Sequence, residues 1–239
     1  SIKSMEDMGY MSDIDNFKIL VSDVSEVVNY IKENHPNLPV FLLGHSMGSF
    51  VSQRYIELFG NSIDGCILSG SALNKGFTIN IGYLLARLIV KSKGRRHRSQ
   101  LLHNLSFGAY NKAFKPARTD FDWLTRDEQI VDEYIADEYC GKVFTASFYK
   151  DLLQGFRNID KNIEIIPNEL PILIFSGDKD PVGASGKSVT KLYDKLMNTG
   201  IVDVTLKLYK DGRHEMLNEI NKDEVYNDVL KWLKHQINE

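Results

Sequence analysis

The sequence is poor in cysteine and has no large excess of charge of either sign. Cys66 and Cys140 are the only two cysteines among 239 residues, and they lie far apart in the chain. This usage predicts buried, reduced thiols, because a disulfide framework or a zinc site needs several cysteines at short spacing. The formal net charge of −3 gives no global basic surface, so we do not expect a nucleic-acid-binding protein.

Long apolar runs, internal repeats and low-complexity segments are absent from the sequence as well. A membrane-spanning helix needs about 20 consecutive apolar residues, and no stretch of this chain is long enough. No signal peptide is recognisable. The hydrophobic share of 43% and the charged share of 26% are ordinary for globular proteins. We therefore expect a soluble protein, located in the cytoplasm.

Short apolar runs alternate with helical patterns at both ends of the chain. Buried strands are expected at 39–43, 64–70, 171–175 and 202–209, and helices at 17–31, at 49–59 and after Asn221. Between about 72 and 165 this alternation stops, and only helical patterns and turns remain. We predict an α/β core made of residues 1–71 and 166–239, with a mostly parallel sheet flanked by helices, and an inserted helical cap at 72–165.

The segment Gly44-His45-Ser46-Met47-Gly48 has the pattern G-x-S-x-G. It lies between a predicted strand and a predicted helix, where a sharp turn forces the serine into a strained and exposed position. The flanking glycines are expected because side chains there would clash with the tightly folded backbone. The pattern alone is weak evidence, but its place between strand and helix favours Ser46 as a nucleophile over an ordinary glycine-rich turn.

A nucleophilic serine needs a base, and the base needs an acid that orients it. Asp178 and Asp180 follow the predicted strand at 171–175, and His214 follows the predicted strand at 202–209. Ligands of open α/β sheets bind at the carboxyl ends of the strands, which is where these residues are expected. The order Ser, Asp, His along the chain is the order that this architecture uses.

On these residues the chain resembles the α/β-hydrolases of the monoacylglycerol lipase and lysophospholipase group. The similar segments are Gly-His-Ser-Met-Gly-Ser at 44–49, Ser-Gly-Asp-Lys-Asp-Pro-Val at 176–182, Gly-Arg-His-Glu at 212–215 and the cap sequence at 119–127. The resemblance implies Ser46 as nucleophile, Asp180 rather than Asp178 as acid, and His214 as base. It also implies an oxyanion hole that includes the backbone N–H of Met47, and no metal or organic cofactor.

The chain departs from that group in front of Ser46. Members carry a His-Gly-type loop after an early strand, and this loop supplies a second oxyanion donor. No such loop precedes Ser46 here, so we expect the first strands and that donor to lie outside this sequence. A shortened variant that truly lacks them would expose sheet edges that proteins usually cover.

The cap contains a strongly apolar segment at 79–90, followed by Lys91, Lys93 and the basic run 95–98. One interpretation is a lid helix that faces an acyl chain or a lipid surface, with the basic residues near anionic headgroups. The alternative is a helix buried between cap and core, followed by a solvated basic loop. The segment itself does not decide between them.

The combined expectation is a serine hydrolase that cleaves carboxylic esters of single-chain lipids, either monoacylglycerols or lysophospholipids. It would act through an acyl-enzyme on Ser46, with possible transient contact between the cap and a membrane surface. Two alternatives remain open. One is another serine hydrolase of the same fold, a small-ester esterase or an aminopeptidase. The other is a non-catalytic fragment, if the front strands are truly absent.

Overall fold

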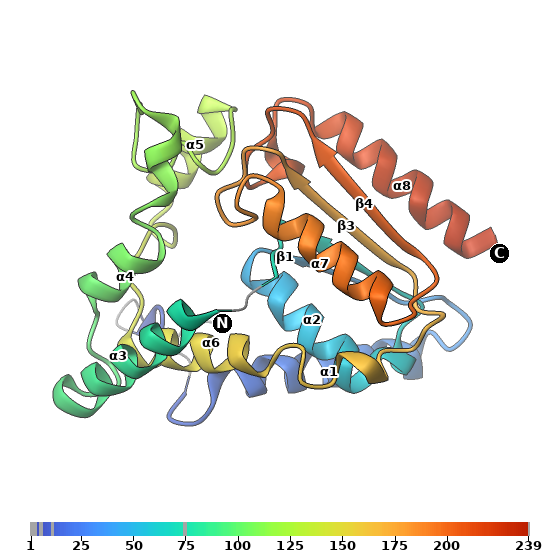
Figure 1. The fold of residues 1–239 in the computed structure, drawn as a ribbon, viewed down its shortest axis with the longest axis horizontal. Helices are drawn as coiled ribbons and strands as arrows, with labels where there is room; N and C mark the ends of the chain where they lie inside the picture. The colour runs from blue at the N-terminus through green and yellow to red at the C-terminus, as the bar shows by residue number, and fades with distance from the viewer. Residues whose placement is uncertain (1–3, 5–6, 11, 74–75, 239) are drawn as a thin grey trace.

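Four strands form one parallel sheet in the computed structural model, which describes residues 4, 7–10, 12–73 and 76–238. In spatial order they are β1 (Phe41–His45), β2 (Gly65–Ser69), β3 (Ile172–Gly177) and β4 (Val204–Tyr209) (Figure 1). Each predicted strand is present, with its bounds shifted by no more than two residues. The prediction of an α/β fold with a mostly parallel sheet is confirmed.

Helices cover both faces of this sheet. The core helices are α1 (Asn16–Asn34), α2 (Met47–Phe59), α7 (Lys187–Asn198) and α8 (Lys222–Asn238). Asp15 caps α1 by accepting a hydrogen bond from the backbone N–H of Lys18 at 3.1 Å, and the helix ends before Pro36, which cannot continue it. The predicted helices at 17–31 and 49–59 therefore exist, each slightly longer than expected.

Side chains alternate across the sheet because successive strand residues point to opposite faces. Cys66 and Leu68 of β2 belong to the apolar cluster that contains residues of α1, α2 and α7. Ile67, between them, belongs to a second cluster with Val225 and Trp232 of α8. Figure 1 shows α8 alone on its side of the sheet. The two middle strands β2 and β3 are thus buried throughout, as parallel strands usually are, whereas β1 at one edge leaves Leu43 44% exposed.

Between β2 and β3 the described residues form helices joined by turns and loops, with no strand apart from one isolated bridge between Arg98 and Thr145. The α-helices are α3 (Phe77–Lys93), α4 (Gln100–Ser106), α5 (Glu128–Ala136) and α6 (Ala146–Asn158). Helices α3, α4 and α6 share an apolar cluster around Ala86, Leu102 and Tyr149, to which α5 contributes no described residue. The exact boundaries of core and cap stay a prediction, because α6 packs on α1 of the core as well as on α3.

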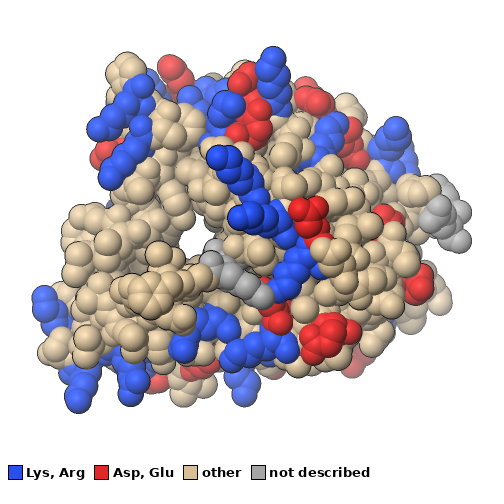
Figure 2. Space-filling view, in the orientation of Figure 1, with Lys and Arg blue, Asp and Glu red and all other residues tan. Residues whose placement is uncertain are grey.

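Helix α3 leaves four large apolar side chains exposed to solvent. Ala86 is its one buried residue, whereas Leu84 is 54% exposed and Leu88 is 63% exposed. Figure 2 shows mainly uncharged atoms over α3, with Lys and Arg side chains around its far end. The interpretation of this segment as a helix buried between cap and core is therefore wrong for the chain as described.

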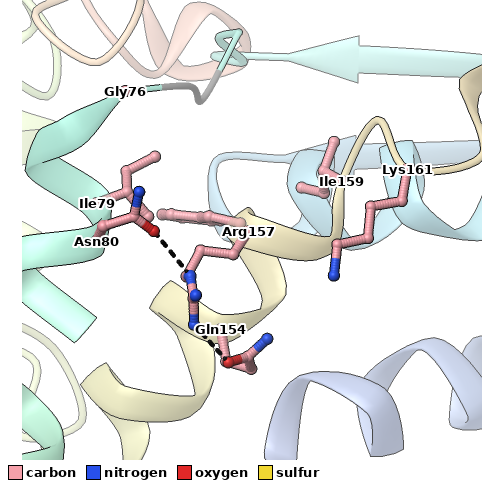
Figure 3. A pocket seen from close by; sticks show the side chains of 8 residues that line it. Gly76, Ile79, Asn80, Gln154, Arg157, Ile159 and Lys161 are labelled. Atoms are coloured by element: carbon pink, nitrogen blue, oxygen red, sulfur yellow. Dashed lines mark hydrogen bonds between the residues drawn. The ribbon is translucent and has the colours of Figure 1, made fainter. Parts of the chain in front are cut away.

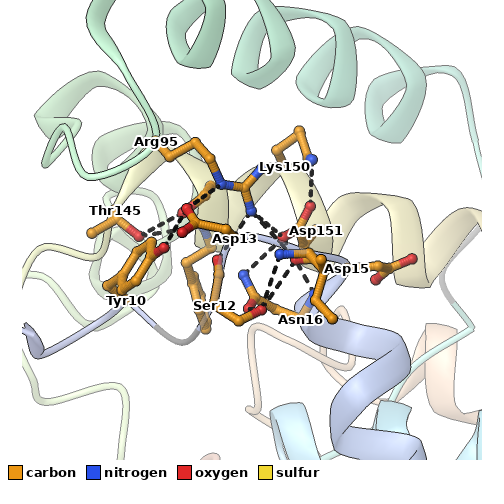
Figure 4. Close-up of polar contacts among 12 residues, drawn as sticks. Tyr10, Ser12, Asp13, Asp15, Asn16, Arg95, Thr145, Lys150 and Asp151 are labelled. Atoms are coloured by element: carbon orange, nitrogen blue, oxygen red, sulfur yellow. Dashed lines mark hydrogen bonds and ion pairs between the residues drawn. The ribbon is translucent and has the colours of Figure 1, made fainter.

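The basic run after α3 is only partly solvated. Arg95 is half-buried and lies 3.4 Å from a carboxylate oxygen of Asp151 on α6. Asp151 is buried and also accepts a 2.7 Å hydrogen bond from the side-chain amide of Asn16, at the start of α1 (Figure 4). Arg96 pairs with Asp7 at 2.7 Å. Arg95 also donates to the carbonyl of Ser12 at 3.1 Å, so both arginines hold the cap to the N-terminal segment. The solvated-loop interpretation does not describe the half-buried Arg95, whereas the side chain of Arg96 is 61% exposed.

Close contact between α6 and α1 depends on Gly155. A Cβ atom at this position would overlap the ring of Phe17. We expect Gly155→Ala to lower the free energy of unfolding by about 1–3 kcal/mol, the usual cost of overpacking, although alanine favours a helix by roughly 0.5–1 kcal/mol. Urea unfolding would measure the change.

The matched control is Gly82→Ala on α3, where the nearest atom to an added Cβ is the end of the Leu153 side chain at 3.3 Å. This variant should be neutral or slightly stabilised. Equal stability of the Gly155→Ala variant and the wild type would show that α6 is not packed against α1 as described.

The two cysteines are both free. Burial raises the pKa of the Cys66 thiol to about 12, so it is an inert part of the core. Cys140 is only partly buried, which corrects the prediction that both thiols are buried.

In the described ranges, no helix is both long enough and apolar enough to cross a bilayer.

Candidate active site

Ser46 occupies a strained turn between β1 and α2. Its backbone has φ 51 and ψ −120, a region that residues other than glycine rarely adopt. The Ser46 N–H donates to the carbonyl of Ser69 at the end of β2 at 3.0 Å, and its own carbonyl accepts from the Ser49 N–H at 2.9 Å. These bonds hold the strained turn, which is the local geometry of a nucleophile elbow.

The two glycines of the motif differ in what they permit. A Cβ at Gly44 would overlap the Ser52 hydroxyl and the Gly48 backbone, so only glycine fits there. A Cβ at Gly48 would meet nothing within 4 Å. The expectation that both flanking glycines avoid a clash is therefore right for Gly44 and wrong for Gly48, where a side chain would extend into open space.

Asp180 and His214 are brought together from the ends of β3 and β4. The His214 Nδ1 lies 3.1 Å from both carboxylate oxygens of Asp180. Asp180 is fully buried and also accepts hydrogen bonds from the Ser176 hydroxyl at 3.0 Å and the Val182 N–H at 2.9 Å. Asp178 instead accepts from the Asp211 N–H at 2.8 Å, and no hydrogen bond joins it to His214 among the described residues.

His214 keeps one ring nitrogen without a partner. Its side chain is 2% exposed, and in the described part of the chain Nε2 has no hydrogen-bond partner. An unpaired buried polar atom costs free energy, and such atoms are often found where a substrate or reacting group completes the site. The structure shows no hydrogen bond between His214 and Ser46 among these residues; in unliganded sites this contact is often long.

Ser46 and His214 are nevertheless close neighbours through His45 and Gly70. The ring centroids of His45 and His214 are 4.8 Å apart. A Cβ at Gly70 would lie 2.9 Å from Cε1 of His214 and 3.1 Å from Cε1 of His45. Because Ser46 directly follows His45, the structure places Ser46, Asp180 and His214 at the same carboxyl edge of the sheet, where ligands of α/β folds bind.

His45, the residue before Ser46, belongs to the surroundings of this site. Its Nδ1 lies 3.0 Å from the Ser69 hydroxyl, and its ring is beside that of His214. Burial, together with the neighbouring His214, lowers the pKa of His45 to about 4. His45 is therefore neutral at pH 7 and adds no positive charge next to His214.

The loop that carries His214 is clamped by the segment that leads to α5. The His214 N–H donates to the carbonyl of Trp123 at 3.3 Å, and the two rings have centroids 5.1 Å apart. Arg126 donates to the buried carboxylate of Glu219 at 2.9 Å, and Glu219 also accepts from the Arg213 N–H at 2.9 Å. The spacing of residues in the sequence does not predict these contacts. The resemblance of residues 119–127 to the cap sequence of the hydrolase group singled out the segment, but not its contacts with the His214 loop.

The remaining predicted group is the backbone N–H of Met47. Met47 is the first residue of α2, and the first N–H groups of a helix have no acceptor within the helix. The positive end of the helix dipole adds to the attraction for an oxyanion. Within the described residues, no group of three or more His, Cys, Asp or Glu side chains could hold a metal ion.

A parallel sheet with a strained serine after one strand, and an aspartate–histidine pair after two later strands, defines an α/β-hydrolase. The comparisons agree with this class. The chain belongs to the family described as "Serine aminopeptidase, S33", whose sequence model matches residues 3–221.

Two curated relatives and one solved structure illustrate the similarity. A monoglyceride lipase of Rattus norvegicus is 25% identical over 229 residues, which are 94% of this chain and 68% of that protein. A monoacylglycerol lipase of Mycolicibacterium smegmatis is 27% identical over 229 residues, with 94% and 71% covered. A thermostable carboxyl esterase of Bacillus coagulans, solved with glycerol, superposes with a TM-score of 0.85 at 24% identity, with 92% of this chain and 72% of that chain covered.

Proposed function

We propose that this chain is a carboxylic-ester hydrolase that cleaves single-chain lipid esters, monoacylglycerols or lysophospholipids, through Ser46, His214 and Asp180. The observation that carries the proposal is the buried Asp180–His214 pair, which leaves Nε2 of His214 without a partner among the described residues. The His214 ring lies 4.8 Å, centroid to centroid, from that of His45, the residue before the strained Ser46. A base with a free nitrogen, oriented by a buried carboxylate, is what a serine needs in order to lose its proton.

The proposed reaction has two acyl-transfer steps. The Ser46 hydroxyl attacks the ester carbonyl carbon while His214 Nε2 takes its proton, and the Met47 N–H donates to the oxyanion that forms. His214 then gives the proton to the leaving alcohol, and the C–O ester bond breaks. Water, deprotonated by His214, then attacks the acyl-enzyme; the ester bond to Ser46 breaks, His214 returns the proton to the Ser46 oxygen, and the fatty acid is released. Asp180 holds the imidazole in the required tautomer throughout.

Support for a lipid ester comes from two directions. The curated relatives described above are named for monoacylglycerols. In addition, α3 exposes an apolar face that includes Phe77, Ile81, Leu84 and Leu88. An exposed apolar stripe on a cap helix suits a substrate that is itself partly apolar.

We also propose a cytoplasmic location, on the ground that both cysteines are unpaired.

A substrate panel tests this function. We expect turnover of monoacylglycerols and lysophosphatidylcholine to rise with acyl chain length from about 4 to 12 carbons, because each buried CH₂ contributes about 0.8 kcal/mol. Aminoacyl p-nitroanilides serve as the aminopeptidase panel, since the family description names that activity. Cleavage of the anilides alone, or of acetyl esters in preference to long-chain ones, would replace the proposal with one of those alternatives.

We further propose that α3 contacts an anionic membrane surface. Arg87, Lys91 and Lys93 on this helix are exposed, and the described residues include no ion-pair partner for them. An apolar stripe beside basic residues is the pattern of helices that lie in the membrane interface. The positive charge of these three side chains complements the anionic headgroup of phosphatidylglycerol, whereas phosphatidylcholine carries no net charge.

Co-sedimentation with vesicles measures this contact. The wild type is expected to bind vesicles that contain phosphatidylglycerol, and Leu88→Glu should reduce the bound fraction several-fold, because a charge replaces a side chain that would enter the apolar region. Leu38→Glu is the matched control, since Leu38 is 62% exposed on the core. Equal binding by both variants, or no binding by the wild type, contradicts the membrane contact.

A further inference from the structure

A pocket that His214 does not line lies between the first turn of α3 and the last turn of α6 (Figure 3). It holds about 310 Å³, at the lower end of the range for small-molecule sites. It is lined by Gly76, Ile79, Asn80, Gln154, Phe156, Arg157, Ile159 and Lys161. None of these residues takes part in the proposed hydrolysis, so the pocket needs its own explanation.

Arg157 is held in the pocket wall by neutral groups. Its Nε donates to Oδ1 of Asn80 at 2.8 Å, and its Nη1 donates to Oε1 of Gln154 at 3.0 Å. The guanidinium also lies over the ring of Tyr83, at 4.5 Å from the centroid. Figure 3 shows Asn80 and Gln154 on either side of it. The charge is thus fixed in place without being neutralised.

Lys161 adds a second positive charge, and its ammonium group again donates to a neutral amide, Oδ1 of Asn158 at 2.7 Å. Neither Arg157 nor Lys161 makes an ion pair with any residue that the structure describes. By contrast, cations close by in the sequence and fold are paired, as Arg54 is with Glu57 and Lys195 with Asp160. A fixed guanidinium without a carboxylate is the arrangement that recognises oxyanions.

The rest of the pocket is apolar. Ile79, Phe156 and Ile159 contribute hydrocarbon surface to the lining. Phe156 packs edge-on against Phe50, with ring centroids 4.7 Å apart. Phe50 lies in the first turn of α2, four residues after Ser46, so the pocket wall is continuous with the helix of the proposed nucleophile.

We infer that this pocket binds an anionic single-chain amphiphile, with its phosphate or carboxylate on Arg157 and Lys161 and its alkyl chain against Ile79, Phe156 and Ile159. A phosphate would come from a phosphorylated lipid, and a carboxylate from a free fatty acid; the shared chemistry is an oxyanion on an alkyl chain. The inference concerns binding outside the Ser46 site and does not require that the chain hydrolyse esters.

Calorimetric titration of the whole chain tests the pocket. The probes are octyl phosphate, octanoate, inorganic phosphate and octyl glucoside, each below its micelle concentration. Octyl phosphate or octanoate should bind more tightly than inorganic phosphate, which lacks the chain, and than octyl glucoside, which lacks the charge. Arg157→Gln and Lys161→Gln should each weaken that binding by about tenfold or more, the effect of losing a charge-assisted hydrogen bond.

Lys210→Gln is the matched control, because Lys210 is an exposed lysine with no role in the pocket; its affinity should equal that of the wild type. The preferred probe, phosphate or carboxylate, identifies the source of the anion. Equal affinity of the Arg157→Gln variant and the wild type, or equal binding of octyl glucoside, overturns the inference. So does inorganic phosphate bound as tightly as octyl phosphate. Because the assay involves no turnover, an inactive chain that still binds would contradict only the proposed function.

Discussion

Replacing Ser46 by alanine is expected to lower kcat for a monoacylglycerol by about 10⁴- to 10⁶-fold, with the fold unchanged. In the proposed mechanism the Ser46 hydroxyl is the group that forms the covalent bond to the acyl carbon. Alanine tolerates the φ of 51 no worse than serine does, so stability should change by less than about 0.5 kcal/mol. Steady-state hydrolysis and thermal unfolding measure the two effects separately.

A fluorophosphonate probe, followed by peptide mapping, adds a direct assignment. The label is expected on Ser46, and it should be lost in the Ser46→Ala and His214→Ala variants. Ser185→Ala is the matched control, because Ser185 is an exposed serine that also has a positive φ, of 53. Turnover close to the wild-type level in Ser46→Ala would exclude Ser46 as the nucleophile. A folded wild type that takes no label would favour the alternative of a non-catalytic fragment.

The fold could be predicted from the sequence because each element carries a local signal. Buried parallel strands are short apolar runs, and α1 has both an apolar stripe and a proline just past its end. The order Ser, Asp, His is also local information, since each residue follows its own strand. What brings the three together is the parallel sheet, because all strand ends of one kind then lie at one edge.

The features that could not be predicted from the sequence depend on contacts between segments that are distant along the chain. The position of the His45 ring is set by β2 and by the loop of His214, and no nearby residue indicates it. The arginines after α3 read as a charge run in the sequence, but Arg95 pairs with a buried carboxylate 56 positions later. The exposure of α3 is also a tertiary property, because an apolar helix can equally well be buried.

Asp180→Asn is expected to lower kcat by about 10⁴-fold, because the asparagine amide no longer holds His214 in the tautomer that leaves Nε2 free to take the Ser46 proton. The variant keeps the volume of the side chain, so the buried site should remain packed. Its effect should appear in kcat far more than in KM, because the lost interaction acts in the transition state and not in substrate binding.

The chain offers a matched control two residues away. Asp178→Asn removes a carboxylate that accepts from the Asp211 N–H and, among the described residues, does not bond to His214, so kcat should change by less than about fivefold. The pair of variants therefore separates a specific orienting acid from a general loss of negative charge near the strand end. If Asp178→Asn were as inactive as Asp180→Asn, the orienting role could not belong to Asp180 alone, and the 3.1 Å contacts between Asp180 and His214 would have to be regarded as structural.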